Sequence, residues 1–125
     1  MSGETIFIVD DDEAVRDSLK LLLESHGCQV EDYGSTRDFF RAYRKGARQC
    51  VVLDHHLPGE TGVEFLESHD GANLRVPVIL VTGGGDQALK ARATKAGALA
   101  YFDKPINDSE LVSTIFRLLD APSAA

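Results

Sequence analysis

The fold is decided by the stretch Cys50-Val51-Val52-Leu53-Asp54-His55-His56-Leu57-Pro58-Gly59. A short apolar run that ends in a carboxylate and a Pro-Gly turn indicates a buried parallel strand that delivers Asp54 to the edge of a sheet. Three other strand-like runs also end on polar residues, at Asp10-Asp11-Asp12, at Thr82 and at Asp103-Lys104. The sequence therefore carries acids, a hydroxyl and an amine to strand ends that can share one edge.

Strand-like and helix-like segments alternate along the whole chain. Strands are expected at about 5–10, 29–33, 50–54, 77–81 and 99–102. Helices are expected at about 13–26, after Ser35, after Thr61, at about 86–96 and after Asn107. Five such units predict an α/β fold, a doubly wound parallel sheet of five strands with helices on both faces. Right-handed crossovers and a polar second strand favour the flavodoxin-like order 2-1-3-4-5.

Polar residues mark where these helices begin. Ser35 with Asp38, Thr61 with Glu64, and Asn107 with Glu110 have the spacing of capping boxes, and Asp86 caps the helix 86–96. The helix after Ser35 is expected to bury Phe39, Phe40 and Tyr43, and 70–73 is expected to be a loop. The apolar face of the helix 86–96 is mostly alanine, so we expect it to dock weakly.

Length and composition are those of one globular domain. The chain has 125 residues, of which 43% are hydrophobic and 26% charged. We expect the domain to cover 1–120, with 121–125 as a tail or the start of a linker. No apolar run approaches the roughly 20 residues that cross a bilayer, and the N-terminus lacks the features of a signal peptide. We therefore expect a cytoplasmic protein without membrane contact.

Charge and cysteine content narrow the function further. A net charge of −7 argues against direct nucleic-acid binding by this domain. Cys28 and Cys50 are interpreted as reduced core residues, because the predicted strand order keeps them too far apart for a disulfide. A solvated helix face, or alternatively a patch for an acidic partner, is formed by the basic residues Arg37, Arg41, Arg44, Lys45 and Arg48.

The convergent strand ends predict an aspartyl-phosphate site. In such a sheet the acids after the first strand and Asp54 lie on neighbouring strands about 5 Å apart. Carboxylates this close repel each other, and a hard cation such as Mg²⁺ (or Mn²⁺) relieves the repulsion, while Asp12 serves as a helix cap. Lys104 lies two strands away, about 10 Å, and its stem covers roughly 6 Å of this distance. With the Thr82 hydroxyl between them, these groups suit phosphoryl transfer to a carboxylate.

Several motifs give the chain a family resemblance over about residues 4–120. They are Ile8-Val9-Asp10-Asp11, Leu53-Asp54 with Leu57-Pro58-Gly59, Val81-Thr82-Gly83, Ala96-Gly97-Ala98 and Lys104-Pro105. These motifs resemble the receiver domain of two-component response regulators. The spacing and the Thr-Gly-x-Gly-Asp segment are most similar to receivers of the nitrogen-fixation type.

The resemblance implies a role for each matching residue. Asp54 would accept a phosphoryl group from a sensor histidine kinase or a phosphotransfer protein. Mg²⁺ (or Mn²⁺) would be held by Asp10, Asp11, Asp54 and the backbone carbonyl of His56. Thr82 and Lys104 would contact the phosphate, the Lys104-Pro105 peptide would be cis, and Tyr101 would be the aromatic that moves inward with Thr82. A half-buried strand aromatic is the alternative interpretation of Tyr101.

The resemblance also implies a signalling role. The face made by the helix 86–96, the strand 99–102 and the last helix would switch and signal to a partner or an output domain. Receivers often dimerise through this face, so a homodimer is one option. Such a domain is a phosphoacceptor with self-catalysed phosphoryl transfer and autodephosphorylation rather than an enzyme. The chain is either a single-domain regulator or the receiver of a longer DNA-binding protein.

The pair His55-His56 departs from the residues more usual after the phosphorylated aspartate. A solvent-facing pair is favoured over a zinc site, because adjacent residues on a tight loop rarely aim both imidazoles at one ion. Our hypothesis is that His56 tunes hydrolysis of the Asp54 phosphate, with Gly84 leaving the opposite lip without a side chain.

Two alternatives come from other classes. A haloacid-dehalogenase-like phosphatase also uses an aspartyl phosphate, but Ala14 stands where its motif needs Thr or Val, and a cap domain and a late acidic pair are lacking. A pseudo-receiver binding module is disfavoured by the complete set Asp10, Asp11, Asp54, Thr82 and Lys104.

Overall fold

The computed structural model describes residues 3–120, and the expected tail at 121–125 lies outside the described residues. One parallel sheet has the order β2-β1-β3-β4-β5, which confirms the predicted topology. Its strands are β1 (Thr5–Val9), β2 (Gln29–Tyr33), β3 (Gln49–Asp54), β4 (Val78–Thr82) and β5 (Ala100–Asp103). The helices are α1 (Glu13–Glu24), α2 (Thr36–Ala42), α3 (Gly62–Glu67), α4 (His69–Ala72), α5 (Gln87–Lys95) and α6 (Asp108–Asp120).

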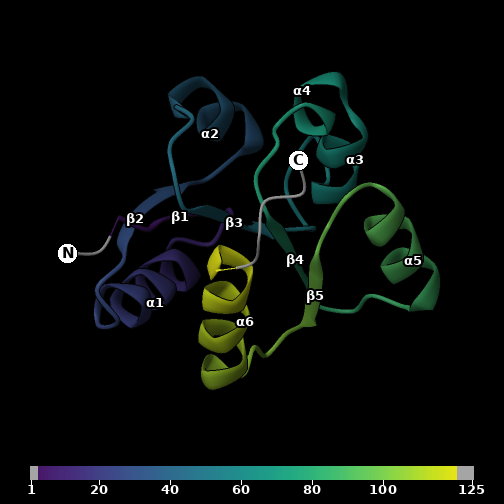
Figure 1. Cartoon of the computed structure of the whole chain (residues 1–125). Helices are drawn as coiled ribbons and strands as arrows, with labels where there is room; N and C mark the ends of the chain where they lie inside the picture. Colours follow the sequence, from purple (N-terminus) through teal and green to yellow (C-terminus); the bar gives the residue numbers. More distant parts are fainter. Residues whose placement is uncertain (1–2, 121–125) are drawn as a thin grey trace.

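Alternate strand residues pack into two apolar cores, one on each face of the sheet. In β1, Phe7 and Val9 join the core that includes residues of α2 and α3, whereas Ile6 and Ile8 join the core that includes α1 and α6. Figure 1 shows α1 and α6 on one side of the sheet and α2, α3 and α4 on the other. The apolar strands β3 and β4 are buried throughout, while the polar edge strand β2 has no fully buried residue. Helices on both faces explain why the central strands lack a polar side.

The predicted capping residues do begin helices. The side chains of Ser35, Thr61, Asp86 and Asn107 each accept a hydrogen bond from a first-turn backbone N–H. Thr61 completes a capping box, since Glu64 Oε1 also accepts from the Thr61 N–H at 2.9 Å. These bonds satisfy N–H groups that the first turn of a helix leaves without an intrahelical partner.

Three local predictions are wrong. Phe40 is 37% exposed, because neighbouring helical residues point in different directions and Phe39 takes the buried position. Tyr43 is half-buried but lies beyond α2, as its C-cap. The expected loop at 70–73 is mostly the short helix α4, which Ser68 begins by accepting a hydrogen bond from the Gly71 N–H.

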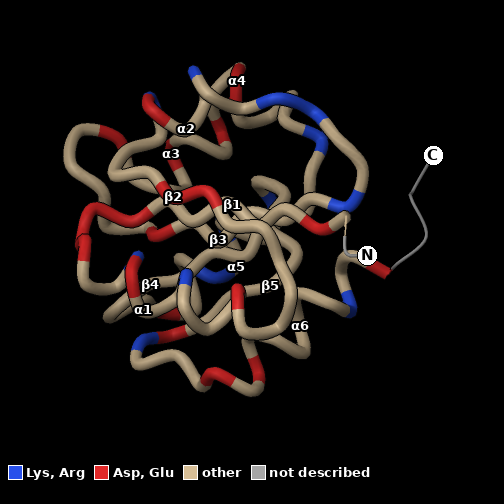
Figure 2. Tube along the Cα trace, turned by 90° about the vertical axis from the view of Figure 1, so that its left-hand side faces the viewer, with Lys and Arg blue, Asp and Glu red and all other residues tan. Residues whose placement is uncertain are grey.

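The exposure of the basic residues and the burial of the two cysteines match the expectations from the sequence. The five basic residues of 37–48 are all exposed, and blue segments lie on the α2 and α4 side in Figure 2. Cys28 and Cys50 are buried and free. Within residues 3–120, we find no helix with the length and apolar character needed to cross a membrane.

Candidate functional site

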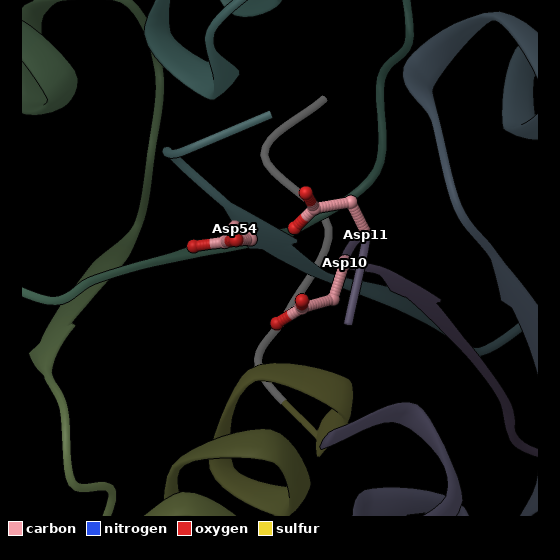
Figure 3. A group of neighbouring side chains, drawn as sticks. All are labelled: Asp10, Asp11 and Asp54. Carbon is pink, nitrogen blue, oxygen red and sulfur yellow. The ribbon is translucent and has the colours of Figure 1, made fainter. Parts of the chain in front are cut away.

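Three carboxylates meet at the carboxyl edge of the sheet. Asp54 is the last residue of β3, and Asp10 directly follows β1, whose Val9 pairs with Leu53. Oxygen atoms of Asp10, Asp11 and Asp54 lie within 4.8 Å of one another, and Figure 3 shows the three side chains around a shared space. Asp10 and Asp54 are 4% and 3% exposed, whereas Asp11 is exposed. Oxygen donors in this arrangement fit a hard divalent cation.

Burial makes the Asp54 carboxylate costly to ionise. Desolvation, followed by the charge of Asp10, raises the pKa of Asp54 above its ordinary value. Lys104 and the backbone N–H of His56, 3.4 Å from Asp54 Oδ1, act in the opposite direction. The site thus concentrates negative charge that a cation would relieve.

The side chain of Lys104, the residue after β5, reaches this charge. Its Nζ lies 3.3 Å from Asp10 Oδ2 and 3.5 Å from Asp54 Oδ1. Desolvation disfavours the ammonium, but Asp10 and Asp54 outweigh it, so the pKa of Lys104 is raised. The backbone holds Lys104 through an N–H bond to the Thr82 carbonyl at 2.8 Å, and the Lys104-Pro105 peptide is cis, as the resemblance implied.

Asp12 and Arg16, at the start of α1, have different roles beside the acids. Asp12 is the N-cap of α1, accepting from the Ala14 N–H at 2.9 Å, so it is the member of the acidic triplet outside the cluster. Arg16 donates to the Asp10 carbonyl at 2.7 Å and to Asp32 Oδ2 at 2.9 Å. Sequence reasoning missed Arg16; its place one turn after the acids, on the helix beside the acidic strand β2, was the available signal.

Thr82 lies between Asp54 and Lys104, as predicted, with a partner that was not predicted. Its side chain is 0% exposed, and its Oγ1 lies 2.9 Å from His56 Nε2. The expectation of a solvent-facing histidine pair is wrong for His55, which is half-buried, and is confirmed for His56, which is exposed although its Nε2 also reaches Thr82. Its neighbour His55 instead accepts from the Val63 N–H at 3.4 Å. Among the described residues, the metal-compatible group contains no histidine, so the zinc interpretation gains no support.

Tyr101 on β5 is half-buried and points toward the same region. Its hydroxyl is buried without a hydrogen-bond partner among the described residues. Burial, then Asp103 and Asp86, raises the pKa of Tyr101. A Cβ on Gly85 would collide with Tyr101 Oη and lie 2.7 Å from Thr82 Cγ2. Gly85 is therefore a second contributor that sequence reasoning missed, because only a glycine leaves room for the tyrosine tip.

Gly84 adopts a positive φ of 119°, and a Cβ placed there would meet nothing within 4 Å. This lip of the site is open, as the sequence predicted for a glycine two residues after Thr82.

Comparisons with known proteins give one consistent family. The family model described as the response regulator receiver domain matches residues 6–116. Nodulation protein W of Bradyrhizobium diazoefficiens is 36% identical over 110 residues, which are 88% of this chain and 48% of that protein. The transcriptional regulatory protein FixJ of Azorhizobium caulinodans is also 36% identical over 110 residues, 88% of this chain and 52% of that protein.

A solved structure supports the same family. The crystal structure of FixJ-N superposes with a TM-score of 0.85 at 32% identity and covers 100% of both chains. The chain spans about half the length of the curated relatives it matches. Phosphorylation and Mg²⁺ are typical of this family. With its sheet order and its acidic edge, the chain belongs to the response regulator receiver domains of two-component systems.

Proposed function

We propose that Asp54 is the phosphoacceptor of this receiver. The observation that supports this proposal is that oxygen atoms of three carboxylates lie within 4.8 Å of one another while Lys104 Nζ lies 3.5 Å from Asp54 Oδ1. The donor would be the phosphohistidine of a sensor histidine kinase or a phosphotransfer protein. An Asp54 oxygen attacks phosphorus and forms the P–O bond, the P–N bond breaks, and the departing imidazole keeps its electron pair and takes a proton.

The chain's own groups serve this transfer in different ways. The Lys104 ammonium is placed to offset charge on the phosphoryl oxygens, and the Thr82 hydroxyl is placed to donate to one of them. The carboxylates of Asp10, Asp11 and Asp54 and the carbonyl of His56 are the proposed ligands of Mg²⁺ (or Mn²⁺). When bound, the ion supplies positive charge to the acids and to the transferring group. Arg16 holds the backbone at Asp10 and so orients the acid pair.

Signalling is proposed to run through the face formed by α5, β5 and α6. Thr82 and Tyr101 lie together at the border between the site and this face, and α5 buries only Ala93 among its nine residues. A weakly docked element can shift when local charge changes. This rearrangement would signal to a partner, an output domain or a second copy of the chain, and self-catalysed dephosphorylation would end it, with His56 and Gly84 setting the rate. We propose a cytoplasmic location, which is general for response regulators.

The family match does not favour the phosphatase or the pseudo-receiver alternative. A phosphatase would turn over a generic phosphate ester, whereas a receiver is labelled once. A pseudo-receiver would not be labelled at all.

The decisive experiment is incubation with acetyl phosphate and Mg²⁺, followed by intact mass. We expect one added phosphate, which is absent in Asp54→Asn and when EDTA removes the metal. Asp12→Asn is the matched control, because Asp12 caps α1 and lies outside the carboxylate cluster, so it should still be labelled. Labelling that persists in Asp54→Asn would overturn the assignment of Asp54.

A further inference from the structure

The Thr82 hydroxyl already has a partner in the unmodified protein. The side chain is 0% exposed, and the 2.9 Å contact with His56 Nε2 is the one hydrogen bond that its hydroxyl makes among the described residues. A buried hydroxyl without a partner is unfavourable. The imidazole of His56 therefore stabilises Thr82 in its resting position.

The same hydroxyl is the group proposed to contact a phosphoryl group on Asp54. His56 follows Asp54 by two residues, and its backbone N–H lies 3.4 Å from Asp54 Oδ1, so the imidazole and the phosphoryl group approach Thr82 from the same loop. A hydroxyl has a single proton to donate. In the tautomer whose Nε2 carries no proton, His56 accepts this proton from Thr82, and a phosphoryl oxygen then competes with His56 for it.

We propose that His56 is a positioning residue that occupies the Thr82 hydroxyl while Asp54 is unmodified and releases it when a phosphoryl group arrives. This inference rests on the proposed role of Asp54. Phosphorylation then exchanges one hydrogen bond of Thr82 for another and gains less than it would with a free hydroxyl. His56 thereby holds the receiver toward its resting state, because a ligand shifts an equilibrium only by its differential affinity for the two states.

His55 does not share this role. It accepts a hydrogen bond from the Val63 N–H and forms an edge contact with the His56 ring at a centroid distance of 5.2 Å. Among the two imidazoles, the contact with Thr82 is specific to His56.

The test is a double-mutant cycle, with beryllofluoride and Mg²⁺ as the phosphoryl mimic. We expect His56→Ala to bind the mimic about fivefold more tightly than the parent, since the mimic then satisfies an unpartnered hydroxyl. In the Thr82→Val background, the same substitution should change affinity less than twofold. His56→Gln, whose amide can also bond the hydroxyl, should restore an affinity close to that of the parent.

Affinity that is unchanged or weaker in His56→Ala would overturn the inference, as would an equal gain with and without the Thr82 hydroxyl. The parent protein provides a measurement without variants: the His56 Nε2 resonance should shift on adding beryllofluoride, and an unshifted resonance would contradict release. A parent that gains no phosphate from acetyl phosphate would refute the proposed function. If the parent gains phosphate but the double-mutant cycle shows no coupling between His56 and Thr82, only the role of His56 is refuted.

Discussion

Strand β3 and the segment from α5 to β5 both lead to the same edge of the sheet, yet they are packed very differently. All six residues of β3 are buried, whereas β5 has no fully buried residue and α5 buries only Ala93. Figure 1 shows β3 in the middle of the sheet and α5 beyond its β4–β5 end. The proposed phosphoacceptor Asp54 is thus placed on a rigid element, whereas α5 and β5 of the proposed signalling face have few buried residues to hold them in place.

The largest effect should come from the core of β3. Leu53 is 0% exposed, so Leu53→Ala is expected to lower the free energy of unfolding by about 3 kcal/mol. The matched variant Leu89→Ala removes the same atoms from α5, where Leu89 is half-buried, and should lower it by about 1 kcal/mol. Urea unfolding of both variants measures the difference. Equal losses would contradict the proposed contrast between β3 and α5.

The next largest effect should come from the close approach of Gly85, beside α5, to Tyr101 on β5. Gly85→Ala should drive the tyrosine tip outward, because a Cβ there collides with Tyr101 Oη, with a loss of about 1–2 kcal/mol. Burial raises the pKa of Tyr101 in the parent, so its pKa should fall toward about 10 once it is solvated. Ultraviolet titration of the tyrosines detects this change.

Gly83→Ala is the control for that experiment. A Cβ on Gly83 would come no closer than 3.8 Å to the Lys104 side chain, so the tyrosine titration should match that of the parent. A Gly85→Ala titration that also matched the parent would show that Tyr101 does not need the space at Gly85.

Features of the fold that depend on short-range sequence patterns could be predicted from the sequence. Apolar runs, caps and strand ends are local, and parallel strands bring their carboxyl ends together without reference to any side-chain conformation. The structure therefore matches the expected sheet order and the positions of Asp10, Asp54 and Lys104.

Contacts that depend on a side-chain rotamer or on a missing atom could not be predicted in this way. His56 and Thr82 are 26 positions apart in the sequence. The sequence alone does not specify which rotamer the imidazole adopts. The space at Gly85 becomes visible only when Tyr101 is in place. Phe40 was misplaced for a simpler reason, since apolar character alone does not decide which of two adjacent helical residues faces the core.

Asp54 itself should reduce stability. Its folded-state pKa lies above the ordinary value, so its contribution favours folding below the unfolded pKa and is lost as the pH rises through the folded pKa. In EDTA at neutral pH, Asp54→Asn should therefore be more stable than the parent, by about 1 kcal/mol. The gain should shrink toward about pH 4. Urea unfolding at both pH values checks this, with the exposed Asp17→Asn as control, and a destabilised Asp54→Asn would contradict it.

The smallest effect should come from the ion pair that ties α5 to α3. Arg92 contacts both carboxylate oxygens of Glu67, at 2.6 and 2.8 Å, and its hydrogen bond lowers the pKa of Glu67. Both side chains are well exposed, so salt screens the pair. Arg92→Ala should speed amide exchange in α5 at low salt and leave β3 unchanged, and high salt should remove the difference. The parent should lose the same protection as the pH falls through the lowered pKa of Glu67. Lys95→Ala, on the same helix without a described ion pair, should exchange like the parent. If amide exchange in Arg92→Ala also matched that of the parent, apolar contacts alone would hold α5, and the ion pair would not contribute to its docking.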